Sequence, residues 1–237
     1  MDDLVIWRYM DFTKFVDLIS TKKLFFCRSD RFDDPFEGSF PYIYVERKIE
    51  EIKQTSNDFE KEIQIYQHAG AGFRKYVYIN CWHNNDCESA ALWKLYLKSN
   101  EGIAIKSTRN KIHESIIDKE YPLFSLLVKY IDYKMDDPPV PTRIAPFRYK
   151  RKSFEHEREM RAVILTEAVD SEGNLKMPVA ENGLKVSVDF NLFVDSIWIA
   201  PTAPAWFIEL VKSVCNQYEI KSEIFISSLL NEYPRFI

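Results

Sequence analysis

Three glutamates alternate with other residues near the end of a charged run, at Glu155, Glu157 and Glu159. Residues two apart on an extended chain point to the same side, so this spacing predicts that two or three of the carboxylates share one face of a strand. One such carboxylate can orient a ribose hydroxyl while its neighbour stabilises the positive charge that develops as a glycosidic bond breaks. The alternative is a solvated strand end, with surface ion pairs of little energetic value to Arg158 and Arg161.

Two other predicted strands carry polar residues that could belong to the same site as these glutamates. Arg8 lies in the first, at residues 4–9, and Arg28 and Ser29 end the second, at residues 24–28. The planar guanidinium of an arginine can bind a pyrophosphate through two parallel hydrogen bonds. Trp82 or Trp93 can wall a planar ring. Trp93 and Tyr96 are three apart on a predicted helix and therefore adjacent, and ordinary core packing is the alternative for that pair.

Two further clusters have metal-binding interpretations that the sequence disfavours. Residues 33–38 (Asp-Asp-Pro-Phe-Glu-Gly) gather oxygen ligands but lack the spacing of a calcium loop, which favours a turn whose aspartates bond their own backbone. A metal-dependent nuclease that uses Asp34, Glu37 and a late glutamate stays an alternative. Cys81, His83 and Cys87 offer three zinc ligands without a CxxC pair, so inert cysteines are favoured.

The charge balance argues against a protein that coats nucleic acid. Lys and Arg total 32 and Asp and Glu total 36, which gives a net charge of −4. One basic cluster precedes the glutamates: Arg143, Arg148, Lys150, Arg151 and Lys152. It can contact the phosphates of a nucleotide or a nucleic acid, and a solvated loop is the favoured alternative.

Composition predicts a globular cytoplasmic protein rich in aromatic residues. The 237 residues are 46% hydrophobic and 15% aromatic, with only 6 glycines, which disfavours glycine-rich phosphate loops. Neither a secretory signal nor a membrane span is expected, and the four cysteines are expected to be reduced. We expect no membrane partner and no metal, and the sequence does not indicate the oligomeric state.

The pattern of elements predicts one α+β domain over residues 1–237, built on a mixed sheet with flanking helices. The chain opens with a strand, a helix capped by Asp11 and a second strand, and residues 42–68 form a helical insertion. A helix follows Asn85 or Asp86 with Glu88 in a capping box, and residues 123–133 form one strand. Residues 167–182 form an exposed loop. The chain ends with strand 196–200, helix 204–218 and strand 223–227, a unit whose two strands are normally parallel.

Motifs along most of the chain resemble a bacterial family called domain of unknown function 2971. They are WRYMDF with KLFFCRSDRFDDPFEG, then CWH with ESAALWKLY and GIAI, and then FRYKRKSFEHEREMR. The resemblance runs from about Trp7 to Arg161, and the family name implies no activity.

The order of elements also resembles the ADP-ribosyltransferase superfamily, with its split sheet. That resemblance implies a dinucleotide-binding role for Arg8 and Tyr9 on the first strand and a ribose-binding role for Ser29. It makes Glu157 or Glu159 the catalytic residue, with the glutamate two positions earlier, Glu155 or Glu157, as the substrate-orienting partner.

These observations favour an NAD-consuming ADP-ribosyltransferase-like enzyme or NAD glycohydrolase. Arg8 would bind the pyrophosphate, and Glu157 would stabilise the cationic state as nicotinamide departs, with Trp82 or Trp93 beside the ring. NAD would be the substrate, and a protein or a nucleic acid is the expected acceptor. Besides the nuclease, the alternatives include a non-enzymatic module that binds a nucleotide-like ligand, and a role in phage defence would suit either class.

Overall fold

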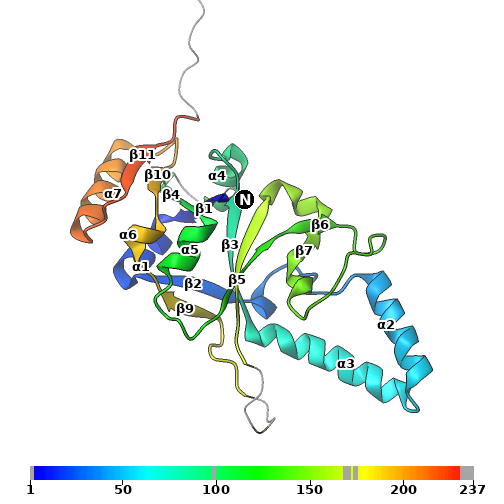
Figure 1. Ribbon diagram of the computed structural model, residues 1–237. Coiled ribbons are helices and arrows are strands. Elements are labelled where there is room, and N and C mark those ends of the chain that lie inside the picture. The colour runs from blue at the N-terminus through cyan, green and yellow to red at the C-terminus, as the bar shows by residue number, and fades with distance from the viewer. Residues whose placement is uncertain (1–2, 98–99, 168–171, 173–175, 230–237) are drawn as a thin grey trace, which may run out of the picture. The chain divides into compact units, whose positions relative to one another are not determined.

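The computed structural model describes residues 3–97, 100–167, 172 and 176–229, and its elements are labelled in Figure 1. The chain forms two compact units. The first unit comprises residues 1–25, 82–119 and 185–237, and the second comprises residues 26–81 and 120–184. Both contain strands and helices, so the α+β class predicted from the sequence is confirmed.

The sheet of the first unit contains both parallel and antiparallel neighbours. Strand β4 (Gly102–Thr108) lies between β1 (Val5–Asp11) and β10 (Ser196–Ile199) and is antiparallel to both. Strand β11 (Glu223–Ile226) is parallel to β10 at the edge. The last residues of β3 (Val77–Asn84) pair with β1, with Trp7 opposite His83. The sheet is therefore mixed, as predicted.

Five helices accompany these strands, and two of them confirm expectations from the sequence. They are α1 (Phe12–Thr21), α4 (Ala90–Tyr96), α5 (Arg109–Ser115), α6 (Phe190–Phe193) and α7 (Ala205–Gln217). Asp11 caps α1 by accepting a hydrogen bond from the Lys14 amide at 2.9 Å. Helix α7 connects β10 to the parallel strand β11, which is the predicted terminal unit.

The second unit is built around β8 (Glu159–Leu165), which pairs with β3 and with β5 (Leu123–Leu127). Val77, Ile79, Phe147 and Val163 form a buried core cluster in this unit. Strands β6 (Lys129–Ile131) and β7 (Tyr149–Arg151) form a separate parallel pair. Strands β2 (Lys23–Arg28) and β9 (Gly183–Ser187) are neighbours in the sheet order.

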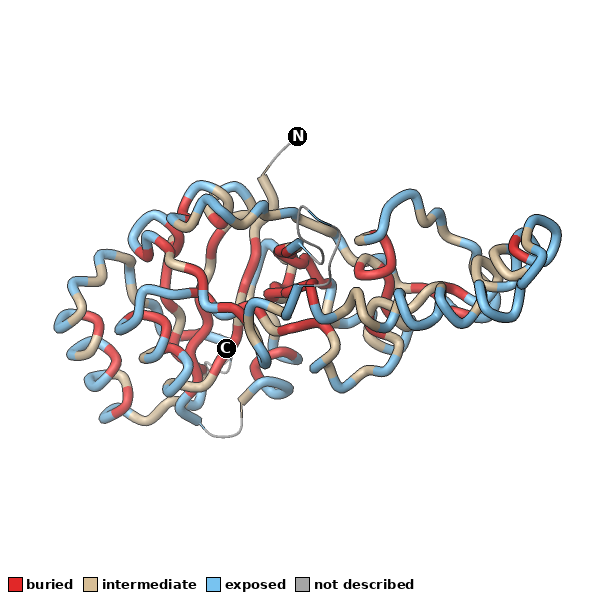
Figure 2. The backbone as a smooth tube through the Cα atoms, turned by 90° about the horizontal axis from the view of Figure 1, so that it is seen from below, coloured by how far each residue is buried: buried red, intermediate tan, exposed pale blue. Residues whose placement is uncertain are grey.

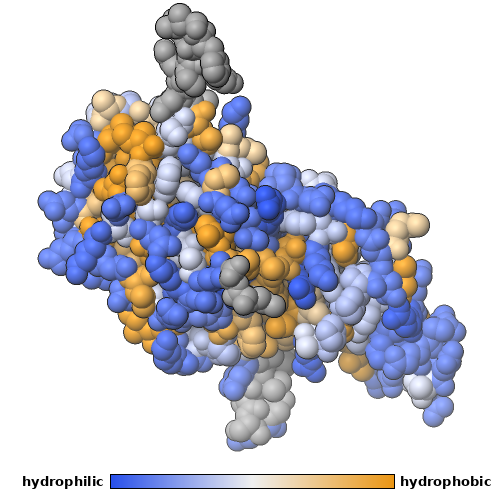
Figure 3. Space-filling view, turned by 45° about the horizontal axis from the view of Figure 1, so that its top comes forward, coloured by the Kyte–Doolittle hydropathy of each residue, from blue (hydrophilic) through white to orange (hydrophobic). Residues whose placement is uncertain are grey.

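Two long helices of the second unit contribute little to its core. Helices α2 (Tyr42–Thr55) and α3 (Phe59–Phe73) occupy the predicted insertion, and α3 extends past its predicted end. Helix α2 buries only Ile52, and α3, all of whose residues are described, buries none; both are mostly pale blue in Figure 2. The end of this unit that the two helices form is mainly hydrophilic on the face shown in Figure 3.

Short 3₁₀ helices connect the strands of the second unit. They are η1 (Ser29–Arg31), η2 (Arg74–Tyr76), η3 (Ala145–Arg148) and η4 (Lys152–Glu157). Within the described part of the chain, no helix is long and apolar enough to cross a membrane.

Two predicted elements are wrong in detail. The strand expected at residues 123–133 is divided, because β5 pairs with β8 only up to Leu127 and β6 then joins β7. The capping box at Asn85 and Glu88 does not form: Ser89 caps α4, and Glu88 accepts a hydrogen bond from Trp93 Nε1 at 2.8 Å. The predicted loop at residues 167–182 lies partly outside the described residues.

Candidate functional site

The three predicted glutamates do not lie together on one strand. Glu159 begins β8, whereas Glu155 and Glu157 lie in η4. Arg158, between them, has a left-handed backbone with φ of 42°, and the chain turns there. The predicted common strand face is therefore wrong, because alternation places side chains on one side only while the backbone stays extended.

Lys150 on β7 nevertheless brings two of the three glutamates together. Its Nζ lies 3.1 Å from Glu159 Oε2 and forms a short contact with Glu157 Oε2. The same ammonium lies 3.7 Å from Oε1 of a third carboxylate, Glu37. Glu155 is exposed and is not among these contacts.

Arg161 connects the same carboxylates from the interior side. Its Nε donates to Glu159 Oε1 at 2.9 Å, and its Nη2 donates to Glu37 Oε1 at 2.8 Å and to Glu159 Oε2 at 3.2 Å. Its Nη1 contacts Glu37 Oε2 at 2.7 Å and donates to the Phe147 carbonyl at 2.8 Å. Arg161 therefore makes four hydrogen bonds and an ion pair within the protein, so its guanidinium is committed to the fold.

We call Glu37, Lys150, Glu157, Glu159 and Arg161 the carboxylate cluster. Within these five side chains, three carboxylates face two cations. The side chains of Lys150 and Glu157 are 11% and 12% exposed, whereas those of Glu37, Glu159 and Arg161 are 2%, 4% and 0% exposed. Lys150 and Glu157 therefore form the solvent-facing end of the cluster.

The surroundings of Glu159 keep it ionised. Burial by itself raises the pKa of this carboxyl, but the charges of Arg161 and Lys150 outweigh burial and lower the pKa to about 2. Burial raises the pKa of the Cys81 thiol well above its ordinary value, and the charge of Glu159 raises it further. The Tyr130 hydroxyl accepts a hydrogen bond from the Glu159 amide at 2.7 Å. Burial raises the pKa of Tyr130 to about 12.

This ionisation predicts a specific loss of stability in acid. Because the pKa of Glu159 is lower in the folded state, its contribution is present above its ordinary value of 4.5 and is lost as the pH falls toward 2. The shift corresponds to a contribution of about 3 kcal/mol to the free energy of unfolding. Urea unfolding between pH 7 and pH 2 should show this loss in the wild type and a shallower loss in Glu159→Gln. Equal slopes below pH 4.5 would contradict the assignment.

Glu37 and Lys150 make contacts that differ from those the sequence predicts. Glu37 lies in the predicted turn, where Gly38 has a φ of 68° and a Cβ would collide with the Phe147 ring. The sequence predicts Lys150 as part of a basic cluster that contacts phosphate or solvent. A local signal exists for the pairing of Arg161 with Glu159, because the two residues are two apart on a strand and share its face, but not for the contacts of Glu37 and Lys150.

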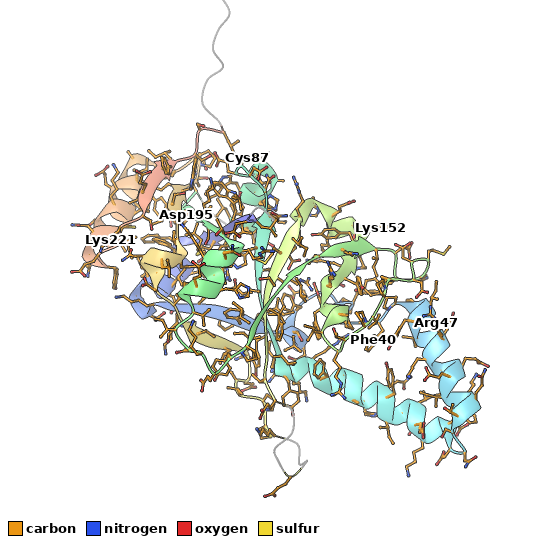
Figure 4. The ribbon with its side chains drawn as sticks, in the orientation of Figure 1. Phe40, Arg47, Cys87, Lys152, Asp195 and Lys221 are labelled. Atoms are coloured by element: carbon orange, nitrogen blue, oxygen red, sulfur yellow. The ribbon has the colours of Figure 1, made fainter. Side chains whose placement is uncertain are left out.

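Most of that basic cluster is bound within the protein. Arg148 Nε donates to the Leu127 carbonyl at 3.0 Å, and Arg151 binds Asp34 at 3.0 Å. Lys152, labelled in Figure 4, binds Asp136 at 3.1 Å.

The predicted residues of the second strand also have structural contacts. The Ser29 hydroxyl is buried and donates to the Arg74 carbonyl at 2.8 Å. Arg28 binds Asp30 through Nε at 2.6 Å and Nη2 at 3.0 Å. Both residues belong to the second unit, as do the three glutamates.

The other predicted residues belong to the first unit and form two aromatic groups. The Arg8 guanidinium lies 5.8 Å from the centroid of the Trp82 ring, and Trp82 packs edge-on against Phe193. Trp82 Nε1 is buried and has no hydrogen-bond partner among the described residues. Tyr9 packs edge-on against Trp93 with centroids 5.0 Å apart.

Tyr9 is also held by the backbone, because its hydroxyl accepts a hydrogen bond from the Ser89 amide at 2.7 Å. Burial raises the pKa of Tyr9. Tyr9 and Trp93 are both buried in one core cluster, and core packing is the alternative that the sequence leaves open for Trp93.

The described residues include no group of three His, Cys, Asp or Glu side chains arranged to hold a metal ion. Asp34 and Glu37, which the nuclease alternative requires, are ion-paired with Arg151 and Arg161. Cys87, labelled in Figure 4, is exposed in the loop before α4.

No family model matches the chain, and no curated protein matches it significantly. Two solved structures are similar to it: Thermus sp. 2.9 DarT in complex with NAD+ and the same protein in complex with carba-NAD+. The first has a TM-score of 0.44 and 6% identity and covers 94% of each chain. The second has a TM-score of 0.41 and 9% identity and covers 94% of this chain and 95% of that chain. A TM-score below 0.5 does not establish a common fold, and the resemblance to the domain of unknown function 2971 family stays a prediction.

Proposed function

We propose that the protein cleaves the glycosidic bond between nicotinamide and ribose in NAD, as an ADP-ribosyltransferase-like enzyme or an NAD glycohydrolase. One observation carries this proposal: three carboxylates gather around Lys150 in the carboxylate cluster, and Glu157 lies at its solvent-facing end. A fixed negative charge in a partly dry site stabilises a positive charge that develops in the transition state.

The negative charge of Glu157 acts in the step in which nicotinamide leaves. The bond from ribose C1′ to the nicotinamide nitrogen breaks, and its electron pair leaves with nicotinamide, which becomes neutral. C1′ then carries positive charge, which Glu157 stabilises. A water molecule or an acceptor hydroxyl donates an electron pair to C1′ and releases its proton to solvent.

Glu159 and Glu155 take different places in this proposal. Glu159 is fully engaged by Arg161 and Lys150, so it serves as the fixed charge behind Glu157. Glu155 is exposed and takes no part. The pyrophosphate-binding role of Arg8 comes from the resemblance and stays a prediction, because Arg8 belongs to the first unit.

Proton NMR of NAD incubated with the purified protein tests the proposed function. We expect nicotinamide to appear in a protein-dependent manner, together with ADP-ribose or an ADP-ribosylated acceptor. NAD that raises the melting temperature and is recovered intact would instead support a binding module. Neither release nor thermal stabilisation would contradict the proposal.

A further inference from the structure

Lys150 is the member of the carboxylate cluster with the most anionic neighbours. Its ammonium contacts one oxygen each of Glu37, Glu157 and Glu159, and lies 4.8 Å from the centroid of the Phe154 ring. The side chain is 11% exposed. A lysine whose charge is already shared among three carboxylates is poorly suited to hold a phosphate, which would have to approach the same carboxylates.

The three carboxylates around Lys150 come from three different segments of the second unit. Glu37 and Glu159 are fixed by Arg161, and Glu37 also lies in a turn closed by hydrogen bonds from the Glu37 amide to Asp34 O and from the Ser39 amide to Phe36 O. Glu157 is the last residue of η4, and the next residue, Arg158, has a left-handed backbone conformation. Lys150 therefore joins the two carboxylates bound by Arg161 to a third one at the end of a short helix.

We infer that Lys150 is a positioning residue, which holds the Glu157 carboxylate where it meets the ribose. This inference rests on the proposed function, and it replaces the phosphate-binding role that the basic cluster suggested. A small displacement of a reacting group costs much of a rate, about 100-fold for roughly 1 Å. The effect of losing Lys150 therefore falls on the chemical step rather than on the affinity for NAD.

Steady-state nicotinamide release by Lys150→Met and Lys150→Arg tests the inference, with Lys152→Met as the matched control. Lys152 lies two residues away and forms an ion pair with Asp136 in which its side chain is 59% exposed. We expect Lys150→Met to lower kcat roughly 100-fold with KM for NAD nearly unchanged. Lys150→Arg keeps the positive charge but places it on a planar guanidinium, so it should lower kcat less than Lys150→Met does. Lys152→Met should leave both kcat and KM unchanged.

The outcomes separate this inference from its rivals. A higher KM with kcat preserved in the Lys150 variants would show phosphate binding and overturn it. A lower melting temperature with both constants preserved would show a purely structural role and also overturn it. If Lys150→Met fails to fold, the split between kcat and KM is read from Lys150→Arg. Absence of release by the wild type overturns the proposed function itself, whereas release that is insensitive to Lys150 overturns the positioning role alone.

Discussion

Glu157→Gln should lower nicotinamide release from NAD at least about 100-fold, the usual cost of removing one group that stabilises developing charge. The amide keeps the size of the side chain and loses the negative charge, so ribose C1′ would no longer face an anion as nicotinamide leaves. Glu157 lies at the end of η4 and its side chain is 12% exposed, so we expect the variant to fold and to keep its affinity for NAD.

Glu155→Gln is the matched control for this experiment. It makes the same chemical change in the same short helix, but at an exposed position outside the carboxylate cluster. We expect this variant to release nicotinamide at the wild-type rate. Equal losses in the two variants, or full activity in Glu157→Gln, would contradict the assignment of Glu157.

The order of elements was largely predictable from local patterns. The β1–α1–β2 opening follows from a β-branched strand, a helix face with its Asp11 cap, and an aromatic strand. The parallel β10–α7–β11 unit follows from Pro204 before the helix and from the length of the crossover. Both depend on residues close together in sequence, where local pattern is informative.

The carboxylate cluster was predictable only in part, because its members come from distant segments. Glu159 and Arg161 are two residues apart on a strand, and their pairing follows from that spacing. The contact between Arg161 and Glu37 joins residues 124 positions apart, and no local pattern indicates it. The alternation of the glutamates was misleading, because the chain forms η4 and then turns at Arg158.

Replacing Arg161 by Met should have the largest effect on stability. The guanidinium is completely buried and binds both Glu37 and Glu159, and its loss removes one of the two cations within the carboxylate cluster. Removing one partner of a buried ion pair typically costs about 3–5 kcal/mol in the free energy of unfolding, because the other charge stays buried without compensation. Urea unfolding at pH 7 measures this loss.

Lys152→Met is the control for that loss. Lys152 binds Asp136 with the two side chains 59% and 39% exposed, and such pairs contribute about 1 kcal/mol or less. A loss of less than about 1 kcal/mol in Arg161→Met would mean that water screens the charges of the carboxylate cluster, which would contradict this prediction.

A second substitution tests whether charge or packing causes the loss in Arg161→Met. Adding Glu37→Gln removes one negative charge from the carboxylate cluster, although it removes another polar contact. If charge dominates, the double variant should be more stable than Arg161→Met alone, since substitutions in one ion network are not additive. A further loss of stability in the double variant would instead identify the packing of Arg161 between Glu37 and Glu159 as the main contribution.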